Sequence, residues 1–359
     1  MQNTSDFRAP KGTLLQEPTL FSWSSPSNIA LVKYWGKKEN QIPANPSLSL
    51  TLDACRTETR VAFSPSEQST FDLLFEGQSK ESFRPKIEKF FQRITPFCEY
   101  LSSVHCSIDT RNTFPHSSGI ASSASAMAAL ALNVMSLERV LHPDMSDDYF
   151  YQKASFLARL GSGSACRSIK GSVVVWGSHK SVADSSDLFG VPFSGPIDPV
   201  FLSYRDTVLL VDKGEKKVSS TVGHELMHGH PFAARRFEQA HENISNISTI
   251  LAKGELEDFC QIVESEALTL HAMMMTSNPY FILMRPNTLE IINRIWSFRE
   301  STKIPVCFTL DAGANVHVLY PEAESGKVLE FIQHELVGFC QNDHYICDNV
   351  GTGSTQPAV

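Results

Sequence analysis

Residues 113–135, TFPHSSGIASSASAMAALALNVM, follow the strand-like segment VHCSIDT at 104–110. The stretch passes from a strand to a loop of small residues and then to a helix rich in Ala and Leu. Small residues let backbone amides approach an anion closely, and the N–H groups and dipole of a helix's first turn stabilise negative charge. Ser122 and Ser123 add hydroxyls that can reach phosphate oxygens or a magnesium ion. The pattern predicts a phosphate-binding helix start, although an ordinary serine-capped helix would contain similar residues.

The length and composition of the chain bound the class of protein. It has 359 residues, 42% of them hydrophobic, which exceeds the usual size of a single core. We therefore expect an N-terminal arm at 1–20 and two domains at 21–190 and 191–359. The net charge of −8 argues against a nucleic-acid partner, which would need a basic face, but a small anionic substrate remains compatible.

The cysteines and apolar segments indicate the compartment. The eight cysteines are scattered, form no C-x-x-C pair and lie in or beside apolar runs, which is typical of buried free thiols in a reducing environment. The first residues carry no secretory signal pattern, and no apolar run reaches the length of about 18 residues that indicates a membrane span. We expect a soluble cytoplasmic protein without a membrane partner.

Hydrophobic periodicity predicts α+β organisation in both halves, with strands and helices grouped rather than strictly alternating. The expected strands include NIALVKYW, SLSLTL, TRVAF and FDLLF in the first half, and DTVLLVD, PVCFTL and VHVLY in the second. The expected helices include RPKIEKFFQRI, DDYFYQKASFLARL, 231–252, 255–275, 287–300 and GKVLEFIQHEL, of which 231–252 ends at Lys253-Gly254 in a plausible C-cap.

Four motifs in this sequence resemble a known family. PHSSGIASSA at 115–124 is similar to the phosphate loop of the GHMP kinase superfamily and is not a Walker A loop, because no Gly-Lys-Ser/Thr follows. The segments SNIALVKYWGKK (27–38), GSGSACRS (161–168) and TLDAGAN (309–315) resemble the diphosphomevalonate decarboxylases, in family order. One departure is Ala314, where the family usually has proline.

The resemblance implies a fold and a reaction. The fold would be the two-domain GHMP kinase fold, with a ribosomal protein S5 domain 2-like N-terminal half and a ferredoxin-like α/β C-terminal half around a shared cleft. The reaction would convert ATP and mevalonate 5-diphosphate to isopentenyl diphosphate, ADP, phosphate and CO2, through phosphorylation of the 3-hydroxyl. ATP with Mg²⁺ and a homodimer are further expectations from the resemblance.

Three residues are the catalytic candidates. Asp311 ends a strand before Ala-Gly and would orient or deprotonate the C3 hydroxyl, although an Asp can also cap such a turn. Lys33, between apolar neighbours, would stabilise Asp311 and the transferring phosphoryl group, unless it is a solvated lysine. Arg167 follows a Gly/Ser loop and would hold the substrate carboxylate in a bidentate grip, unless it is a surface arginine.

The resemblance also assigns binding residues. Contacts to the substrate are expected from Tyr34, Lys37, Ser162, Ser164, Ser220, Thr221 and His224, the last standing where the family usually has methionine.

Contacts to ATP are expected near the phosphate loop, with Ser122 and Ser123 also the candidates for Mg²⁺. The family further uses an Arg or Lys from the 70–90 region near the phosphates, and Lys80, Arg84 and Lys86 remain open alternatives. The residues that the resemblance assigns to ATP contacts are Asn112, Ser118, Gly119, Ala121, Ser122 and Ser123.

Other chemistries are also possible from the residues. GHELMHGH at 223–230 contains H-E-x-x-H, the zinc-protease signature, but Gly223, Gly229 and Pro231 leave little room for the helix that must hold both imidazoles. Cys166 beside Arg167 could have a lowered thiol pKa, yet no paired histidine is apparent. A sibling enzyme that acts on mevalonate 5-phosphate or mevalonate, and a non-catalytic nucleotide-binding regulator, are the remaining alternatives.

Overall fold

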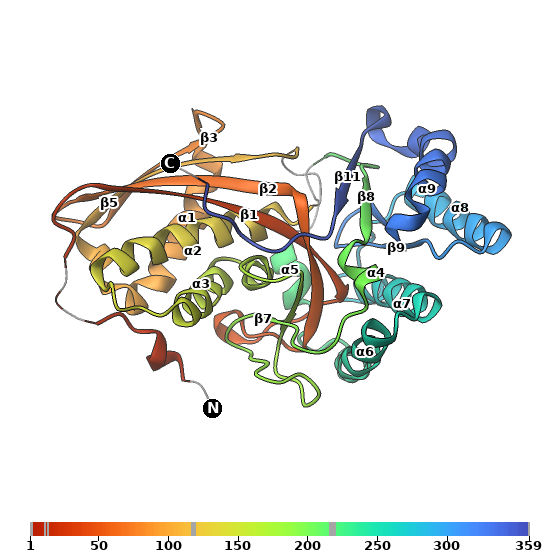
Figure 1. The fold of residues 1–359 in the computed structure, drawn as a ribbon, viewed down its shortest axis with the longest axis horizontal. Helices are drawn as coiled ribbons and strands as arrows, with labels where there is room; N and C mark the ends of the chain where they lie inside the picture. The colour runs from red at the N-terminus through yellow and green to blue at the C-terminus, as the bar shows by residue number, and fades with distance from the viewer. Residues whose placement is uncertain (1–2, 11, 13, 116–119, 215–219, 358–359) are drawn as a thin grey trace.

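The computed structural model describes residues 3–10, 12, 14–115, 120–214 and 220–357. Within these residues the chain forms two sheets that lie side by side, each covered by helices (Figure 1). The larger sheet has the strand order β4-β3-β5-β2-β6-β7 with β1 paired to β2, and the smaller sheet has the order β11-β8-β10-β9. The expected α+β class is confirmed.

The strands of the larger sheet are β1 Thr19–Val32, β2 Ser47–Pro65, β3 Thr70–Phe75, β4 Gln78–Ser79, β5 Val104–Asn112, β6 Val173–Trp176 and β7 Val191–Pro192. Those of the smaller sheet are β8 Arg205–Leu209, β9 Cys307–Thr309, β10 Val316–Tyr320 and β11 Tyr345–Asn349.

The helices are α1 Arg84–Ile94, α2 Ser122–Leu141, α3 Asp147–Gly161, α4 Pro199–Leu202, α5 Ser220–Glu225, α6 Ala233–Lys253, α7 Leu256–Met275, α8 Pro286–Thr302 and α9 Ser325–Phe331. The expected C-cap after Lys253 is confirmed, because Gly254 adopts a left-handed conformation with φ 72° and its N–H bonds to the Ile250 carbonyl.

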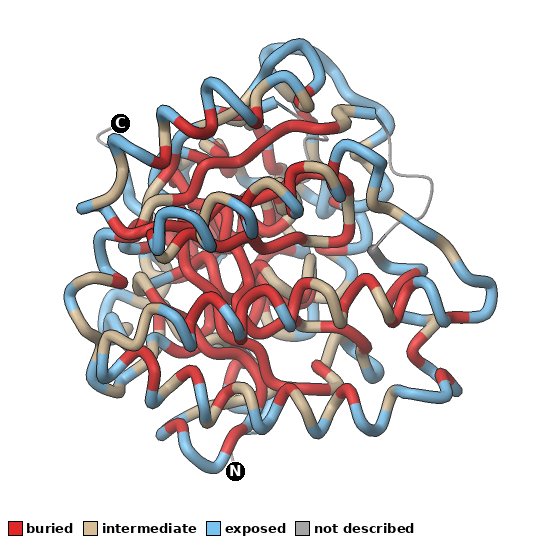
Figure 2. Tube along the Cα trace, turned by 90° about the vertical axis from the view of Figure 1, so that its right-hand side faces the viewer, coloured by how far each residue is buried: buried red, intermediate tan, exposed pale blue. Residues whose placement is uncertain are grey.

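Helix α2 is the central helix of the first half. It packs against β1, β2 and α3, and 78% of its most apolar 18-residue window is buried inside the protein. Its length and composition alone would suit a membrane span, but here the apolar surface is covered by the protein's own core. Figure 2 shows the buried segments gathered in the interior, with exposed residues on the outer turns of the helices.

The segments SLSLTL and TRVAF, predicted as separate strands, form the single long strand β2 in the structure. β1 runs antiparallel to β2 from Thr19↔Phe63 to Val32↔Leu48, with register shifts between Pro26 and Asn28 and between Ala30 and Val32. Such irregularities bend a long strand without ending it. β1 nevertheless ends at Val32, so the expectation of a strand through Trp35 was wrong, and Lys33 begins a non-repetitive segment.

The C-terminal segment returns to the first half, which was not expected from the sequence. After β11, bridges join Leu52 to Val350, Lys170 to Gly353 and Ser24 to Thr355. In Figure 1 this blue segment passes from the smaller sheet along β1 and β2. The predicted division into 1–20, 21–190 and 191–359 stays a prediction.

One carboxylate of β11, just before the returning segment, joins the smaller sheet to β2. The oxygens of Asp348, 3% exposed, accept hydrogen bonds from the backbone N–H groups of Asp53, Ala54 and Cys55 at 2.9, 2.7 and 2.7 Å. Charged acceptors make such bonds stronger than neutral ones.

We predict that Asp348→Asn lowers the free energy of unfolding by about 2 kcal/mol, because one acceptor oxygen becomes an NH₂ group facing a backbone N–H. Urea denaturation measures the change. Asp53→Asn, at an exposed neighbour, is the control and should stay within about 0.5 kcal/mol of wild type. Equal stability of the two variants would contradict the role of Asp348.

Candidate active site

A cavity of about 300 Å³ brings together most of the site residues expected from the sequence. It lies where the end of β1 and the start of α2 meet the loop after β9. Residues far apart in the sequence therefore share one small volume. The expected residues that line it are Lys33, Tyr34, Lys37, Ala121, Ser123, Ser162, Ser164, Arg167, Thr221, His224 and Asp311.

Lys33 and Asp311 meet in this cavity. The Lys33 ammonium donates to Oδ1 of Asp311 at 3.1 Å, and the Lys33 side chain is 2% exposed whereas that of Asp311 is 29% exposed. Burial lowers the pKa of Lys33, and the neighbouring Asp311 carboxylate opposes that shift. His271 also contacts the Asp311 carbonyl, through Nε2 at 3.1 Å, which helps to fix the loop after β9.

Arg167 is held rigidly in the cavity wall. It lies in the short 3-10 helix Gly163–Ser168, is 3% exposed, and donates from Nε and Nη2 to Asn28 Oδ1 at 3.3 and 3.2 Å and from Nη1 to Ser47 Oγ. Burial lowers its pKa, but a guanidinium stays charged. These bonds fix the plane of the guanidinium, and each terminal nitrogen carries a second N–H.

The start of α2 forms another part of the wall. Ala121, the residue before the helix, has φ 26° and no side-chain acceptor for the N–H groups of the first turn. Ser123 Oγ lies 3.2 Å from Ser162 Oγ, and both residues line the cavity. Helix α2 has 20 residues, so its N-terminal dipole is directed at this space.

Other expected ATP-side and substrate contacts lie elsewhere or outside the described residues. Asn112, at the end of β5, does not line the cavity. Its Oδ1 accepts a hydrogen bond from the hydroxyl of Thr57 in β2. Ser122 is the first residue of α2 and does not line the cavity. Ser118 and Gly119 lie outside the described residues, and Ser220 begins α5 with its side chain undescribed.

His224 closes one side of the cavity between two aromatic rings. Its ring centroid lies 4.2 Å from that of Tyr34 and 4.6 Å from that of Trp35, and Nδ1 accepts from the Gly36 N–H at 3.0 Å. Burial, with help from Lys37 and Arg167, lowers the pKa of His224 to about 3. A neutral ring that accepts at Nδ1 carries its proton on Nε2.

Two further lysines line the cavity. Lys37 Nζ lies 3.6 Å from Glu225 Oε1. Among the open alternatives from the 70–90 region, Lys86 of α1 lines the cavity. Desolvation by the surrounding protein lowers its pKa to about 8, although the residue is exposed at the surface. Arg84 instead pairs with Glu88 and lies over the Phe71 ring, and Lys80 precedes the short 3-10 helix Glu81–Phe83.

The GHELMHGH stretch does not build a zinc-protease helix. Helix α5 ends at Glu225, before His228, so the two imidazoles of the motif do not share a helical face. His230 Nε2 instead contacts the Met273 carbonyl at 3.0 Å. Within the part of the chain that the structure describes, no three His, Cys, Asp or Glu side chains are grouped to hold a metal ion.

The described cysteines are free thiols, buried except for Cys347. Burial raises the pKa of Cys166 to about 12, although Arg167 opposes the shift. A thiol with so high a pKa is not a nucleophile near neutral pH. The alternative of a lowered pKa at Cys166 was therefore wrong.

Some residues of the site were missed in the sequence. Trp35 and Leu270 line the cavity, and Asn28 and Ser47 hold Arg167. Asn28 lies inside the SNIALVKYWGKK motif, so its position in the motif was a usable signal. Ser47 and Leu270 belong to segments whose patterns indicate only a strand and a helix, and only the tertiary fold brings them here.

Such a cavity suits an enzyme that acts on a small, multiply anionic substrate, since cationic side chains and a helix start surround a carboxylate that can take a proton. Comparison with known proteins gives the family. The protein-family model described as "Diphosphomevalonate decarboxylase-like N-terminal domain" matches residues 25–187. A second family model, "Mevalonate 5-diphosphate decarboxylase C-terminal domain", matches residues 207–355. The chain belongs to the diphosphomevalonate decarboxylase family.

Individual relatives agree with this assignment. The diphosphomevalonate decarboxylase of Candida albicans is 29% identical over 87% of each chain. The solved mevalonate diphosphate decarboxylase of Staphylococcus aureus has a TM-score of 0.81 and 26% identity, covering 95% of this chain and 98% of that one. A solved structure named "MDDEF in complex with MVAPP, AMPPCP and Magnesium" has a TM-score of 0.81 and 28% identity, covering 95% of this chain and 100% of that one.

We predict that His224 makes the protein sensitive to acid. The pKa of His224 is about 3 in the folded protein against an ordinary 6.5, so the unfolded chain binds a proton that the folded protein excludes. The stability that the neutral ring contributes is therefore complete above pH 6.5 and declines as the pH falls toward 3, by about 1.4 kcal/mol per pH unit.

His224→Gln, which keeps an acceptor for the Gly36 N–H, should remove this component. Urea denaturation of both proteins between pH 7 and 4 measures it as a difference that changes with pH. Stabilities of wild type and variant that fall in parallel would contradict the neutral, buried state of His224.

Proposed function

We propose that this chain catalyses the ATP-dependent decarboxylation of mevalonate 5-diphosphate, with isopentenyl diphosphate, ADP, phosphate and CO2 as products. The single observation that carries the proposal is the meeting of Lys33, Asp311 and Arg167 in one cavity beside the start of α2. Family membership and the likeness to a structure in complex with MVAPP, AMPPCP and magnesium support it.

Asp311 would act on the 3-hydroxyl of the substrate. A tertiary hydroxyl is a poor leaving group, so it is first converted to a phosphate ester by transfer from ATP. Asp311 would orient this hydroxyl and accept its proton. The Lys33 ammonium, 3.1 Å from Oδ1, stabilises the ionised carboxylate and the negative charge of the phosphoryl group in transfer.

Arg167 would control the second step. When the 3-phosphate leaves, C3 becomes electron-deficient, and the C–C bond to the carboxylate breaks so that its electron pair forms the new double bond and CO2 departs. A guanidinium whose plane is fixed by Asn28 and Ser47 can hold that carboxylate through two parallel N–H bonds until then. Premature loss of CO2 is thereby avoided.

The phosphate groups would be held at two places. The start of α2 fits the ATP phosphates, because Ala121 leaves the first-turn N–H groups uncapped by a side chain and Ser123 lines the cavity. Ser123, which lines the cavity, is the residue whose hydroxyl would hold magnesium, which when bound neutralises phosphate charge; Ser122, the other candidate, does not line the cavity. Lys37, Tyr34 and His224 would contact the diphosphate end of the substrate.

We also propose that the chain works as a cytoplasmic homodimer. Members of the diphosphomevalonate decarboxylase family commonly form homodimers, and closed two-fold dimers are the most frequent oligomers among proteins. Light scattering on the purified protein distinguishes a dimer from a monomer of 39.9 kDa.

We predict that the purified protein, supplied with ATP and Mg²⁺, releases ADP and CO2 in equal amounts from mevalonate 5-diphosphate. Mevalonate and mevalonate 5-phosphate should react at least about 100-fold more slowly, because the contacts to the terminal phosphate stay unmade. Coupled ADP detection with ¹⁴CO2 trapping measures both products. ADP without CO2 would identify a kinase, and turnover of the 5-phosphate alone would identify the sibling enzyme.

We predict that Asp311→Asn lowers product formation by about 10³-fold, because the neutral amide cannot accept the hydroxyl proton. Binding of a non-hydrolysable ATP analogue, measured by calorimetry, should change by less than about threefold. Asp144→Asn, at an exposed position on the surface, is the matched control and should keep full activity. An Asp311→Asn variant with wild-type turnover would refute the assignment.

A further inference from the structure

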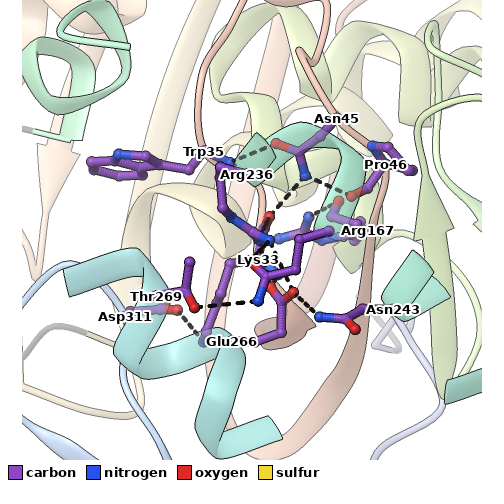
Figure 3. A network of polar contacts seen from close by, with 12 residues as sticks. Lys33, Trp35, Asn45, Pro46, Arg167, Arg236, Asn243, Glu266, Thr269 and Asp311 are labelled. Carbon is purple, nitrogen blue, oxygen red and sulfur yellow. Dashed lines mark hydrogen bonds and ion pairs between the residues drawn. The ribbon is translucent and has the colours of Figure 1, made fainter. Parts of the chain in front are cut away.

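The main chain at Lys33 is held by the second half of the protein. β1 ends at Val32, so the backbone of Lys33 forms its hydrogen bonds with side chains instead of with a neighbouring strand. Its N–H donates to Glu266 Oε2 at 2.8 Å, and its carbonyl accepts from Arg236 Nη2 at 3.1 Å (Figure 3). Asn45 adds a second donor to the same carbonyl at 2.9 Å.

Glu266 and Arg236 form a fully buried ion pair between α7 and α6. Both side chains are 0% exposed, and Arg236 Nη2 lies 2.5 Å from Glu266 Oε2. The Glu266 carboxylate also accepts from Asn243 Nδ2 and from the Lys33 N–H, so four hydrogen bonds converge on it. Replacing a buried ion pair by apolar residues is often neutral for stability, so stability alone does not explain why this pair faces Lys33.

We propose that Arg236 and Glu266 are positioning residues for the reaction: they fix the backbone of Lys33 so that its ammonium stays opposite Asp311. The proposal rests on the proposed function. Neither residue touches the cavity, and both act through Lys33.

The charges around Lys33 determine in which direction the pKa of its ammonium changes when Glu266 is replaced. Asp311 and Glu266 favour the charged ammonium, whereas burial and the Arg167 guanidinium oppose it. Two more groups lie near Lys33. The Lys33 charge opposes the rise in the pKa of the His317 imidazole, and the Arg236 guanidinium donates to the Lys33 carbonyl. Removing the charge of Glu266 therefore lowers the pKa of Lys33 further.

The first test is the pH profile of Glu266→Gln. Glutamine keeps an acceptor for the Lys33 N–H but no charge, so the alkaline limb of kcat should move to lower pH by about one unit. Wild type must be active under the same assay, so an inactive wild type would count against the proposed function, whereas an unmoved limb in an active variant overturns the role of Glu266.

A matched control exists in the first half. Glu138 and Lys153 form another ion pair with both side chains 0% exposed, at 2.7 Å, near the far end of α2. Glu138→Gln makes the same chemical change about 24 Å along the helix from Ser122. It should lower the thermal midpoint without moving the alkaline limb, and an equal movement of the limb in both variants would overturn the proposal.

A second variant keeps the test decisive if Glu266→Gln does not fold. Arg236→Lys retains a positive charge beside Glu266 but gives up the planar donor to the Lys33 carbonyl. We expect kcat to fall about tenfold with KM and the alkaline limb unchanged, since position and not charge is altered. A folded Arg236→Lys protein with wild-type kcat would overturn the positioning role.

Discussion

The ion pair between the buried Lys33 and the partly exposed Asp311 is the contact on which the site depends. Lys33 follows β1 in the first half and Asp311 follows β9 in the second, so the pair exists only when both sheets are formed and correctly apposed. Removing the ammonium from water is unfavourable, and the carboxylate at 3.1 Å offsets part of that penalty. In the proposed mechanism the same two charges therefore serve both catalysis and the contact between the two halves.

The rest of the architecture holds this pair in place. Helix α2 directs its N-terminus at the cavity, the Gly163–Ser168 turn fixes Arg167, and the Arg236–Glu266 pair grips the main chain beside Lys33. Asp348 of β11 accepts a hydrogen bond from the β2 backbone, and the segment after β11 adds bridges to the first half. Phosphoryl transfer is accelerated mainly by positioning and by fixed charges, and a rigid frame of this kind suits that chemistry.

Much of the fold and of the cavity lining was predictable from the sequence, for identifiable reasons. Helix α1 matches the predicted segment because its apolar residues recur at helical spacing, and Lys33, Arg167 and Asp311 lie in motifs whose order carries the resemblance. The end of β1 at Val32 was not predictable, because the apolar pattern continues through Trp35. Glu266 and Arg236 were missed because charged residues on amphipathic helices are usually solvated, and only tertiary packing buries this pair.

A crystal structure with mevalonate 5-diphosphate and AMPPCP tests the central claim most directly. The account predicts that the 3-hydroxyl lies within about 3 Å of an Asp311 carboxylate oxygen, with the nucleotide's terminal phosphate at the start of α2 and the substrate carboxylate on Arg167. A substrate bound outside this cavity, or bound inside it with its hydroxyl away from Asp311, would contradict the account.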